Sequence, residues 1–469
     1  MMSTELAYTS ATELVRRYRA KELSPVEVTQ AALARIREFN PRLNAFCLVD
    51  EEGALAAARA SEARWTKGAP LGWVDGVPAS IKDLILTRGW PTLRGSKSVD
   101  AAGPWGEDGP ATARLRENGA VLLGKTCTPE FGWKGVTDSA LTGITRNPWN
   151  TERTPGGSSG GASAQVAAGM GQLAVGTDGG GSIRIPCSFA GISGIKAGFG
   201  RVPAWPLSPF GTVAHVGPMA RSIADCALML NVLSQPDTRD WTALPYANID
   251  WTQGLDAGVK GMKVAYSPRL GYVKHVDAEV EARVADAVKV LAGLGATVEE
   301  VDPGFADCRQ IFWVHWTAGA YNFLRNMPRE KFALLDPGLR QACESGSKHT
   351  LAQYLDAVNA RGALGEHMKR FHEKYDLLLT PATSIPAFAV GVVAPERADG
   401  EQDWTWWTPF SFPFNLTQQP ALSVPCGFSG DGMPIGLQMV GPMQREDLVL
   451  RAAHAYQQAT SHHLQRPPL

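Results

Sequence analysis

The chain has 469 residues, of which 44% are hydrophobic and 19% are charged, a composition typical of a globular protein with a sizeable core. Its 45 lysines and arginines nearly balance its 46 aspartates and glutamates, so the net charge of −1 offers no basic field for nucleic acid or an anionic membrane. Seven scattered cysteines without a CxxC pair argue against disulfides or zinc, and residues 1–20 lack an apolar leader, so we expect a cytoplasmic protein.

Short strands and helices are predicted to alternate in the first half of the chain. Ser24-Pro25-Val26-Glu27 is a capping box with proline at the first helical position, and it predicts a helix that stops near Asn40-Pro41. The following segments are then expected to be helices (Ala54–Arg64, Ala111–Asn118, Ala162–Gly169), a strand pair around Asp75-Gly76 (Val74–Leu86), strands (Ala120–Leu123, Gln172–Gly176) and an apolar element (Phe189–Ile195).

The second half continues the same alternation after a polar surface excursion near residues 237–252. A strand is expected over Lys263–Ala265, a helix over Ala278–Leu294 and a strand over Gly295–Val298. Residues 305–375 have a mostly helical pattern and are expected to form an insertion over a cleft. Together these elements predict a single large α/β domain over residues 1–469, with a mixed central sheet covered on both faces by helices.

One segment fits the phosphate-loop pattern GxxxxGK[ST], namely residues 119–126. That mechanism needs an open loop followed by a helix, whereas the four middle residues here are apolar and Thr128-Pro129 would break a helix. We therefore expect a buried strand, with nucleotide binding as the alternative.

A second pattern, GxSxG, fits twice, around Ser158 and around Ser159. In lipase-like hydrolases this elbow follows a hydrophobic strand, whereas the composition of residues 147–155 indicates a loop here. A triad of serine, histidine and aspartate, with His454, His462 or His463 as the base, is kept as an alternative.

Two serines stand in glycine-rich turns and a lysine lies upstream of both. Ser158 is framed by glycines on each side, and Ser182 follows three glycines. Such turns expose backbone N–H groups and suit an oxyanion hole beside a nucleophile. Lys82 lies in an apolar segment, where burial would lower its pKa and let it accept a proton from serine. The alternative for Lys82 is an ordinary strand-edge lysine paired with Asp83.

Segments that carry a family resemblance span most of the chain: Gly76–Asp83, Gly119–Gly132, Thr145–Trp149, Gly156–Gly161, Gly176–Pro186, Gly191–Lys196, Phe412–Asn415 and Gly432–Gly441. With them the sequence resembles the amidase signature family of serine hydrolases, with the signature core at about residues 70–200. The resemblance implies that Ser182 is the nucleophile, that Lys82 is the base and that Ser158 bridges them. It also implies a non-proline cis peptide bond before Ser158. No metal or organic cofactor is expected.

The resemblance further assigns the oxyanion hole to four consecutive N–H groups, those of Gly179, Gly180, Gly181 and Ser182. It places Gly132 and Trp133 along the substrate cleft. Asp178 and Arg184 flank the glycine loop. An ion pair between them would fix the shape of the catalytic loop, and the alternative is a salt bridge that serves only the stability of the fold. Two departures from the family pattern are the glycine at 179, where a side chain is common, and Lys196-Ala197 in place of Lys-Pro.

The expected partner is a small-molecule amide or carbamate substrate, with no nucleic acid and no membrane, and a homodimer is considered as the assembly. Several aromatic residues could form an apolar substrate pocket or could simply be buried: Trp205, Phe210, Trp313, Trp316, Trp404, Trp406 and Trp407. Without a cationic cluster, we expect neutral amides, with anilides and carbamates (urethanes) as candidates. The alternatives are the glutaminase subunit of a transfer-RNA amidotransferase and a catalytically inactive binding protein on the same scaffold.

Overall fold

The computed structural model describes residues 2–397 and 403–469. Its central sheet contains eleven strands: β1 (Phe46–Val49), β2 (Pro78–Lys82), β3 (Val121–Thr126), β6 (Leu173–Asp178), β7 (Ser193–Lys196), β8 (His215–Ala220), β9 (Lys263–Tyr266), β10 (Thr297–Glu300), β11 (Leu377–Pro381), β12 (Ala421–Phe428) and β13 (Pro434–Val440). Their order across the sheet is β1-β3-β2-β6-β8-β7-β12-β13-β11-β9-β10. The sheet is mixed, because β2 runs parallel to β3 and β6 whereas β6 and β8 are antiparallel. Strands β4 (Asp138–Ser139) and β5 (Gly143–Ile144) pair separately.

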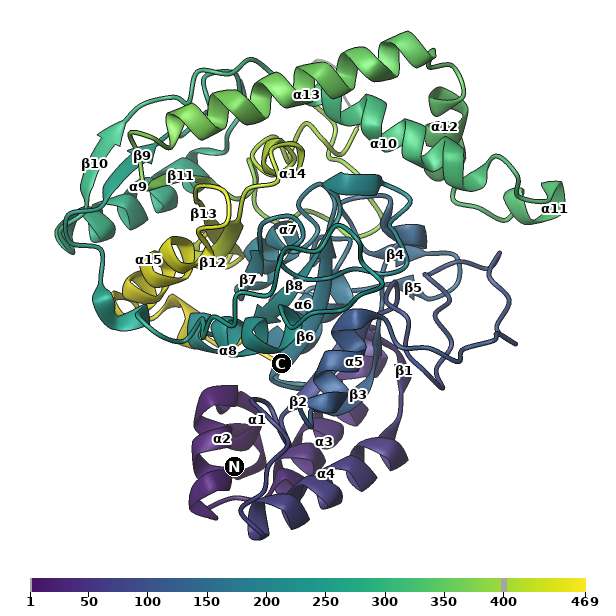
Figure 1. Cartoon of the computed structure of the whole chain (residues 1–469), viewed down its shortest axis with the longest axis vertical. Coiled ribbons are helices and arrows are strands. Elements are labelled where there is room, and N and C mark those ends of the chain that lie inside the picture. Colours follow the sequence, from purple (N-terminus) through teal and green to yellow (C-terminus); the bar gives the residue numbers. More distant parts are fainter. Residues whose placement is uncertain (1, 398–402) are drawn as a thin grey trace.

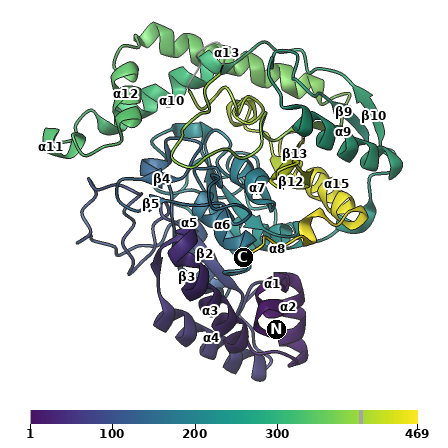
Figure 2. The same ribbon diagram turned by 180° about the vertical axis from the view of Figure 1, so that it is seen from behind.

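The helices of the described residues surround this sheet: α1 (Met2–Tyr8), α2 (Ala11–Ala20), α3 (Pro25–Leu43), α4 (Glu51–Thr66), α5 (Pro110–Glu117), α6 (Gly160–Ala167), α7 (Arg184–Ala190), α8 (Ile223–Leu233), α9 (Ala278–Gly293), α10 (Arg309–Leu324), α11 (Arg329–Phe332), α12 (Pro337–Gly346), α13 (Leu351–Phe371), α14 (Pro413–Leu416) and α15 (Glu446–Ala459). Short 3-10 turns form at Glu130–Gly132, Gly211–Val213, Leu255–Ala257 and His462–Leu464. Figures 1 and 2 show α1–α4 at one end of the molecule and α10–α13 at the other. None of the described helices is long and apolar enough to cross a bilayer.

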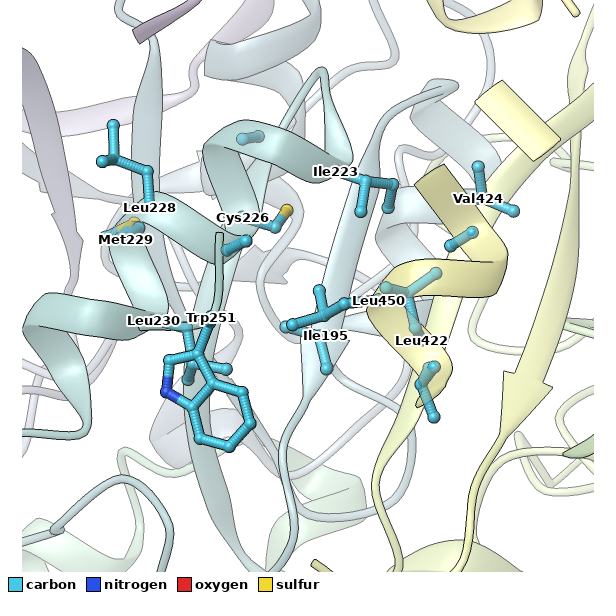
Figure 3. Close-up of a cluster of buried hydrophobic side chains, with 14 of the residues drawn as sticks. Ile195, Ile223, Cys226, Leu228, Met229, Leu230, Trp251, Leu422, Val424 and Leu450 are labelled. Carbon is cyan, nitrogen blue, oxygen red and sulfur yellow. The ribbon is translucent and has the colours of Figure 1, made fainter. Parts of the chain in front are cut away.

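Both faces of the sheet are buried, because alternate side chains of a strand point to opposite sides. Leu173 and Val175 of β6 join the largest hydrophobic cluster, whereas Ala174 between them joins the cluster formed with α6 and α7. Figure 3 shows part of the largest cluster, where Ile195 of β7 and Leu450 of α15 lie together. Burying a side chain of this size stabilises the fold by roughly 1.5–3 kcal/mol. The predicted sheet with helices on both faces is confirmed.

Most of the predicted elements are present, with three differences. The strand pair expected over Val74–Leu86 is one strand, β2, because residues 74–77 form a turn in which the Val77 N–H donates to the Val74 carbonyl at 3.0 Å. The element expected over Phe189–Ile195 is the end of α7 followed by β7, separated by Gly191 at a φ of 69°. Helix α3 continues through Pro41 to Leu43, where Asn44 ends it in the left-handed conformation.

The phosphate-loop pattern forms strand β3, in which all six residues are buried. A strand of this kind has no open loop for phosphate, so the structure supports the interpretation of this segment as a buried strand. The helical character expected over residues 305–375 is also confirmed, since α10–α13 occupy most of that segment.

Candidate active site

The sheet brings Lys82 and the glycine loop together. Lys82 is the last residue of β2, and Asp178 is the last residue of the parallel neighbour β6. The carboxyl ends of parallel strands meet at one edge of a sheet, which is where ligands bind in α/β proteins. Ser182 lies between β6 and α7, and Ser158 lies just before α6. The strand topology therefore gathers residues that are far apart in sequence.

Lys82 is fully buried and surrounded by hydroxyl groups. Its Nζ lies within hydrogen-bond distance of Ser158 Oγ (2.7 Å), Ser159 Oγ (2.9 Å) and Thr177 Oγ1 (2.8 Å). Burial lowers the pKa of Lys82 well below its ordinary value, and the nearby Asp178 carboxylate opposes this only in part. The arrangement favours a neutral amine that can accept a proton.

The alternative pairing of Lys82 with Asp83 is wrong. Asp83 instead lies 3.4 Å from Lys125 Nζ, and both side chains are buried. Lys125 also donates to the Ile85 carbonyl at 2.8 Å. Lys82 therefore has no salt bridge that would hold its amine in the charged form, among the residues the structure describes.

The two serines differ in their surroundings. Ser158 is 1% exposed, and the peptide bond between Gly157 and Ser158 is cis, as the family resemblance implies. Ser182 is 7% exposed, and within residues 2–397 and 403–469 its hydroxyl has no hydrogen-bond partner. The Ser159 N–H donates to the Ser182 carbonyl at 3.2 Å, which ties the two turns together. The Ser182 hydroxyl is consequently free to meet a ligand.

The glycine loop presents some of its N–H groups and uses others internally. Those of Gly179, Gly180 and Ser182 have no hydrogen-bond partner in the described part of the chain. The Gly181 N–H, in contrast, donates to Asp178 Oδ1 at 2.8 Å. The sequence-based assignment of Gly181 to an oxyanion hole is therefore corrected, because an N–H group bound to a carboxylate is not available to a ligand.

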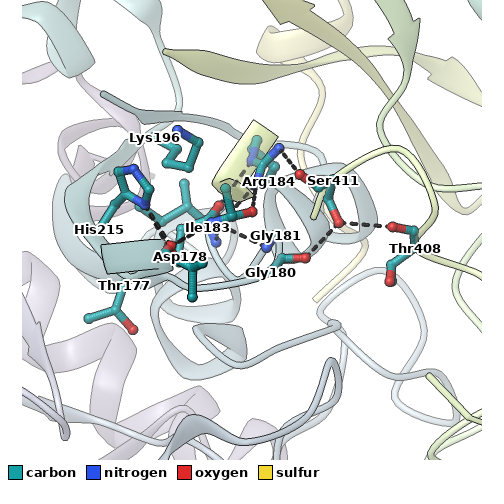
Figure 4. Close-up of polar contacts among 12 residues, drawn as sticks. Thr177, Asp178, Gly180, Gly181, Ile183, Arg184, Lys196, His215, Thr408 and Ser411 are labelled. Carbon is teal, nitrogen blue, oxygen red and sulfur yellow. Dashed lines mark hydrogen bonds and ion pairs between the residues drawn. The ribbon is translucent and has the colours of Figure 1, made fainter. Parts of the chain in front are cut away.

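An ion pair between Asp178 and Arg184 holds this loop (Figure 4). Arg184 Nε and Nη2 donate to the two carboxylate oxygens at 3.0 and 2.9 Å, and both side chains are fully buried. Burial raises the pKa of Asp178, but the Arg184 guanidinium outweighs burial and holds that pKa below its usual range. The Ile183 N–H also donates to this carboxylate, at 3.1 Å. The expected ion pair is confirmed, and it shapes the loop through backbone N–H groups.

Residues from the C-terminal part of the chain complete this support. Asn415 Nδ2 donates to Asp178 Oδ1 at 2.8 Å, and Arg184 Nη1 donates to Gln438 Oε1 at 2.7 Å. Ser411 Oγ donates to the Gly180 carbonyl at 2.6 Å (Figure 4). This support was only weakly indicated by the sequence, in that Asn415 and Gln438 fall in the two late segments that resemble the family.

Aromatic rings pack directly behind the loop and explain its glycines. A Cβ at Gly179 would lie 2.9 Å from a ring carbon of Trp316, and one at Gly180 would lie 2.8 Å from Phe312 Cζ. The space that a side chain at position 179 would need is thus filled by Trp316.

A cavity of about 1090 Å³ opens beside these groups. Its lining includes Gly132, Ser158, Thr177, Gly179 and Ser182. Of the aromatic residues expected there, Trp205, Phe210 and Trp316 line it. The Phe210 and Trp316 rings are stacked with centroids 3.7 Å apart. One side of the cavity is therefore aromatic, as expected for an apolar substrate.

The other tryptophans belong to the core instead. Trp133, Trp404, Trp406 and Trp407 are at most 7% exposed and pack in one aromatic cluster, and Trp313 packs against it. The expected substrate contact of Trp133 is corrected accordingly, since its carbonyl accepts a hydrogen bond from Trp316 Nε1 at 3.2 Å and the cavity is lined by Phe131 and Gly132 instead.

The sequence did not reveal most of the remaining cavity wall. The segment of residues 203–216 contributes much of it, and α10 and α13 add His315, Tyr354 and Arg361. Three prolines between residues 203 and 209 could have indicated a shaped surface loop. Among the described residues, no cluster of His, Cys, Asp and Glu could hold a metal ion.

The late histidines do not form a triad with the serines. His454 lies on α15, and its Nε2 contacts Asp256 at 3.1 Å. None of His454, His462 and His463 lines the cavity. The serine, histidine and aspartate alternative is therefore not supported by the structure.

Comparisons with known proteins identify the family of this chain. The amidase family model matches residues 27–450. An acylamidase of Rhodococcus erythropolis is 36% identical over 470 residues, covering 97% of this chain and 96% of the relative. A glutamyl-tRNA(Gln) amidotransferase subunit of Geobacter metallireducens is also 36% identical, over 487 residues, covering 97% of this chain and 98% of the relative.

The structural comparison gives the same result. The crystal structure of a bacterial aryl acylamidase belonging to the amidase signature enzymes superposes with a TM-score of 0.90 at 30% identity, covering 97% of both chains. The match covers nearly the whole of both chains rather than one motif. This chain belongs to the amidase signature family.

Proposed function

We propose that the protein hydrolyses the C–N bond of small amides through an acyl-enzyme on Ser182, with Ser158 and Lys82 relaying protons. The observation that carries this proposal is the buried Lys82 amine, hydrogen-bonded to Ser158 at 2.7 Å beside a cavity that also exposes the Ser182 hydroxyl. A serine hydroxyl needs a proton acceptor to become a nucleophile, and a lysine accepts a proton only when it is neutral.

The proposed reaction has two half-reactions. Ser182 Oγ attacks the amide carbonyl, and its proton passes through Ser158 to Lys82 and then to the leaving nitrogen. The N–H groups of Gly179, Gly180 and Ser182 stabilise the negative oxygen of the tetrahedral intermediate; one such donor typically contributes about 2.7–4 kcal/mol. Water then hydrolyses the acyl-enzyme by the same proton path in reverse. The Ser182 hydroxyl makes no hydrogen bond to Ser158 among the described residues, so the proposed relay requires that this bond form in the substrate complex, where catalytic hydrogen bonds tighten.

The substrates that fit this cavity best are amides with an aryl or other apolar group. Trp205, Phe210 and Trp316 supply the aromatic wall. The similarity to an acylamidase and to an aryl acylamidase also supports an amide substrate with an apolar group. Anilides and aryl carbamates share the tetrahedral chemistry and belong to the same proposal. The expected homodimer and the expected absence of a nucleic-acid partner stay predictions.

The second candidate is the glutaminase subunit of a transfer-RNA amidotransferase, because that relative is as similar as the acylamidase. In that case the purified chain would release ammonia from glutamine and would depend on partner subunits. Turnover of an anilide by the purified chain, with no effect of glutamine, distinguishes the stand-alone amidase.

The test is hydrolysis of an aliphatic amide, a 4-nitroanilide and an aryl carbamate by wild type and by Ser182→Ala. We expect the substitution to lower kcat by roughly 10⁵- to 10⁶-fold, as the loss of a serine nucleophile does in other hydrolases. Ser208→Ala is the control, because Ser208 also lines the cavity but its hydroxyl only accepts a backbone N–H, that of Phe210, at 3.2 Å. Equal activity of wild type and Ser182→Ala would exclude Ser182 as the nucleophile.

A further inference from the structure

Arg94 is a cavity-lining cation that the proposed reaction does not use. It lines the main cavity with Ser158 and Ser182, and it also lines a second cavity of about 450 Å³. In the described part of the chain its guanidinium has neither an ion pair nor a hydrogen bond to another residue. Arginine carries five N–H donors and keeps its charge in proteins, so an unpartnered guanidinium facing a cavity is suited to an anionic ligand.

The nearby carboxylate of Asp83 does not occupy Arg94. Asp83 is paired with Lys125 at 3.4 Å and accepts the Gly95 N–H at 3.3 Å. Burial lowers the pKa of Arg94, and Asp83 offsets this only in part. The guanidinium is thus partly desolvated without full compensation from the protein, a situation that a bound carboxylate would relieve.

The lining of the second cavity is positively charged, which suits a ligand that carries a carboxylate. Its lining contains two cationic residues, Arg94 and Lys331, and no carboxylate. Phe131 and Phe323 line both cavities and pack edge to face with ring centroids 4.9 Å apart. These two rings and Arg94 therefore form a junction that is aromatic on one side and positively charged on the other.

The backbone connects this junction to the reacting groups. The Phe131 N–H donates to the Arg94 carbonyl at 2.8 Å. The next residue is Gly132, where a Cβ would lie only 3.2 Å from Ser158 Oγ. In the proposed reaction Ser158 returns the proton to the leaving nitrogen. Gly132, Phe131 and Arg94 therefore form a continuous stretch of cavity wall that begins beside Ser158, the proton donor to the leaving nitrogen in the proposed reaction. The leaving amine would lie along this stretch.

We infer that Arg94 binds a carboxylate on the amine portion of the substrate, so that the protein prefers amides of acidic arylamines or of short amino acids. The inference rests on the proposed amidase function and refines its substrate class. From the sequence we expect neutral amides, and the substrate inferred here departs from that expectation: the scissile amide is neutral, but a negative charge lies at the far end of the leaving group. The aryl ring or chain would lie against the packed pair of Phe131 and Phe323.

The test compares 4-acetamidobenzoate with its methyl ester, in which one added methyl group removes the negative charge at the far end of the leaving group. We expect wild type to favour the acid in kcat/KM by roughly 10- to 100-fold, the effect of a charge-assisted hydrogen bond. Arg94→Gln should bring this ratio close to one, and Arg94→Lys should restore part of it because the charge is kept. Lys97→Gln is the matched control, because it removes an exposed positive charge three residues away that lines neither cavity.

A binding measurement separates this inference from the proposed reaction. Calorimetric titration of 4-acetamidobenzoate into Ser182→Ala should show binding that is weakened by adding Arg94→Gln and unchanged by adding Lys97→Gln. Hydrolysis of both substrates with equal kcat/KM by wild type would overturn the role of Arg94 and leave the amidase proposal standing. Binding that depends on Arg94, in a protein that hydrolyses no amide, would support the anion site and overturn the proposed reaction.

Discussion

Lys82 is held by three hydroxyl groups and by no carboxylate among the described residues. A carboxylate partner would keep the amine charged, whereas hydroxyl groups can also donate to a neutral amine. The apolar strand around Lys82 correctly indicated its burial. Ser159 and Thr177 were not predicted as its partners, because they reach Lys82 only when β2 and β6 lie side by side.

The first prediction at this scale concerns pH. Burial lowers the pKa of Lys82, so the amine is protonated, and the proposed base lost, as the pH falls through that lowered value. We expect kcat/KM to rise with pH and to level off well below the ordinary lysine pKa of about 10.4. Initial rates with a 4-nitroanilide across this range measure the profile.

Two further measurements make the pH experiment decisive. Circular dichroism at each pH shows whether the protein stays folded, so that unfolding is not mistaken for titration. Lys82→Ala should lower kcat by roughly 10²- to 10⁴-fold, the usual contribution of general acid–base catalysis. A flat profile, or an acid limb centred at about 10.4 or higher, would contradict a buried lysine base.

At the scale of elements, the loop between β6 and α7 depends on a buried ion pair. Asp178 and Arg184 face each other at 2.9 Å with both side chains fully buried. Such a pair need not stabilise a protein more than apolar residues would, but removing one partner leaves an uncompensated charge in the core. Here it also directs the Gly181 N–H into the protein and leaves the neighbouring N–H groups for a ligand.

We therefore predict that Arg184→Met lowers the free energy of unfolding by about 3–5 kcal/mol, because the Asp178 carboxylate loses its buried partner. Urea titration followed by tryptophan fluorescence measures this loss. The control is Arg16→Met, which removes an exposed ion pair with Glu13 and should cost less than about 1 kcal/mol. Equal losses for the two variants would show that the buried pair does not hold the loop.

At the scale of the whole molecule, helix α13 is joined to the cavity wall through Arg361. Its guanidinium donates to the Leu416 carbonyl and to Thr212 Oγ1, each at 2.7 Å. Leu416 ends α14, the helix that also carries Asn415 of the loop support. Helix α13 thus lines the cavity through Arg361 and is fastened to Thr212, another residue of the cavity wall.

We predict that Arg361→Met raises KM by roughly 10-fold with a smaller change in kcat. The loss of three hydrogen bonds, each with a charged donor, loosens the wall that contacts substrate and leaves the Lys82 cluster in place. Steady-state kinetics with a 4-nitroanilide separate the two parameters. Arg370→Met is the control, because Arg370 lies on the same helix and pairs only with Glu366 at the surface. A variant with lower kcat and unchanged KM would contradict this role.

The sequence by itself determined the family and the mixed sheet between helices, through its motifs and its hydrophobic periodicity, and it proposed Lys82, Ser158 and Ser182 as site residues. Only the tertiary structure decided which N–H groups remain free, which tryptophans face the cavity and that Arg94 has no partner among the described residues. Those properties depend on contacts between distant segments, such as the hydrogen bond from Arg184 to Asn415, 231 residues further along the chain. Local sequence carries no record of such contacts, since they form only when the packed sheet and its helices bring the segments together.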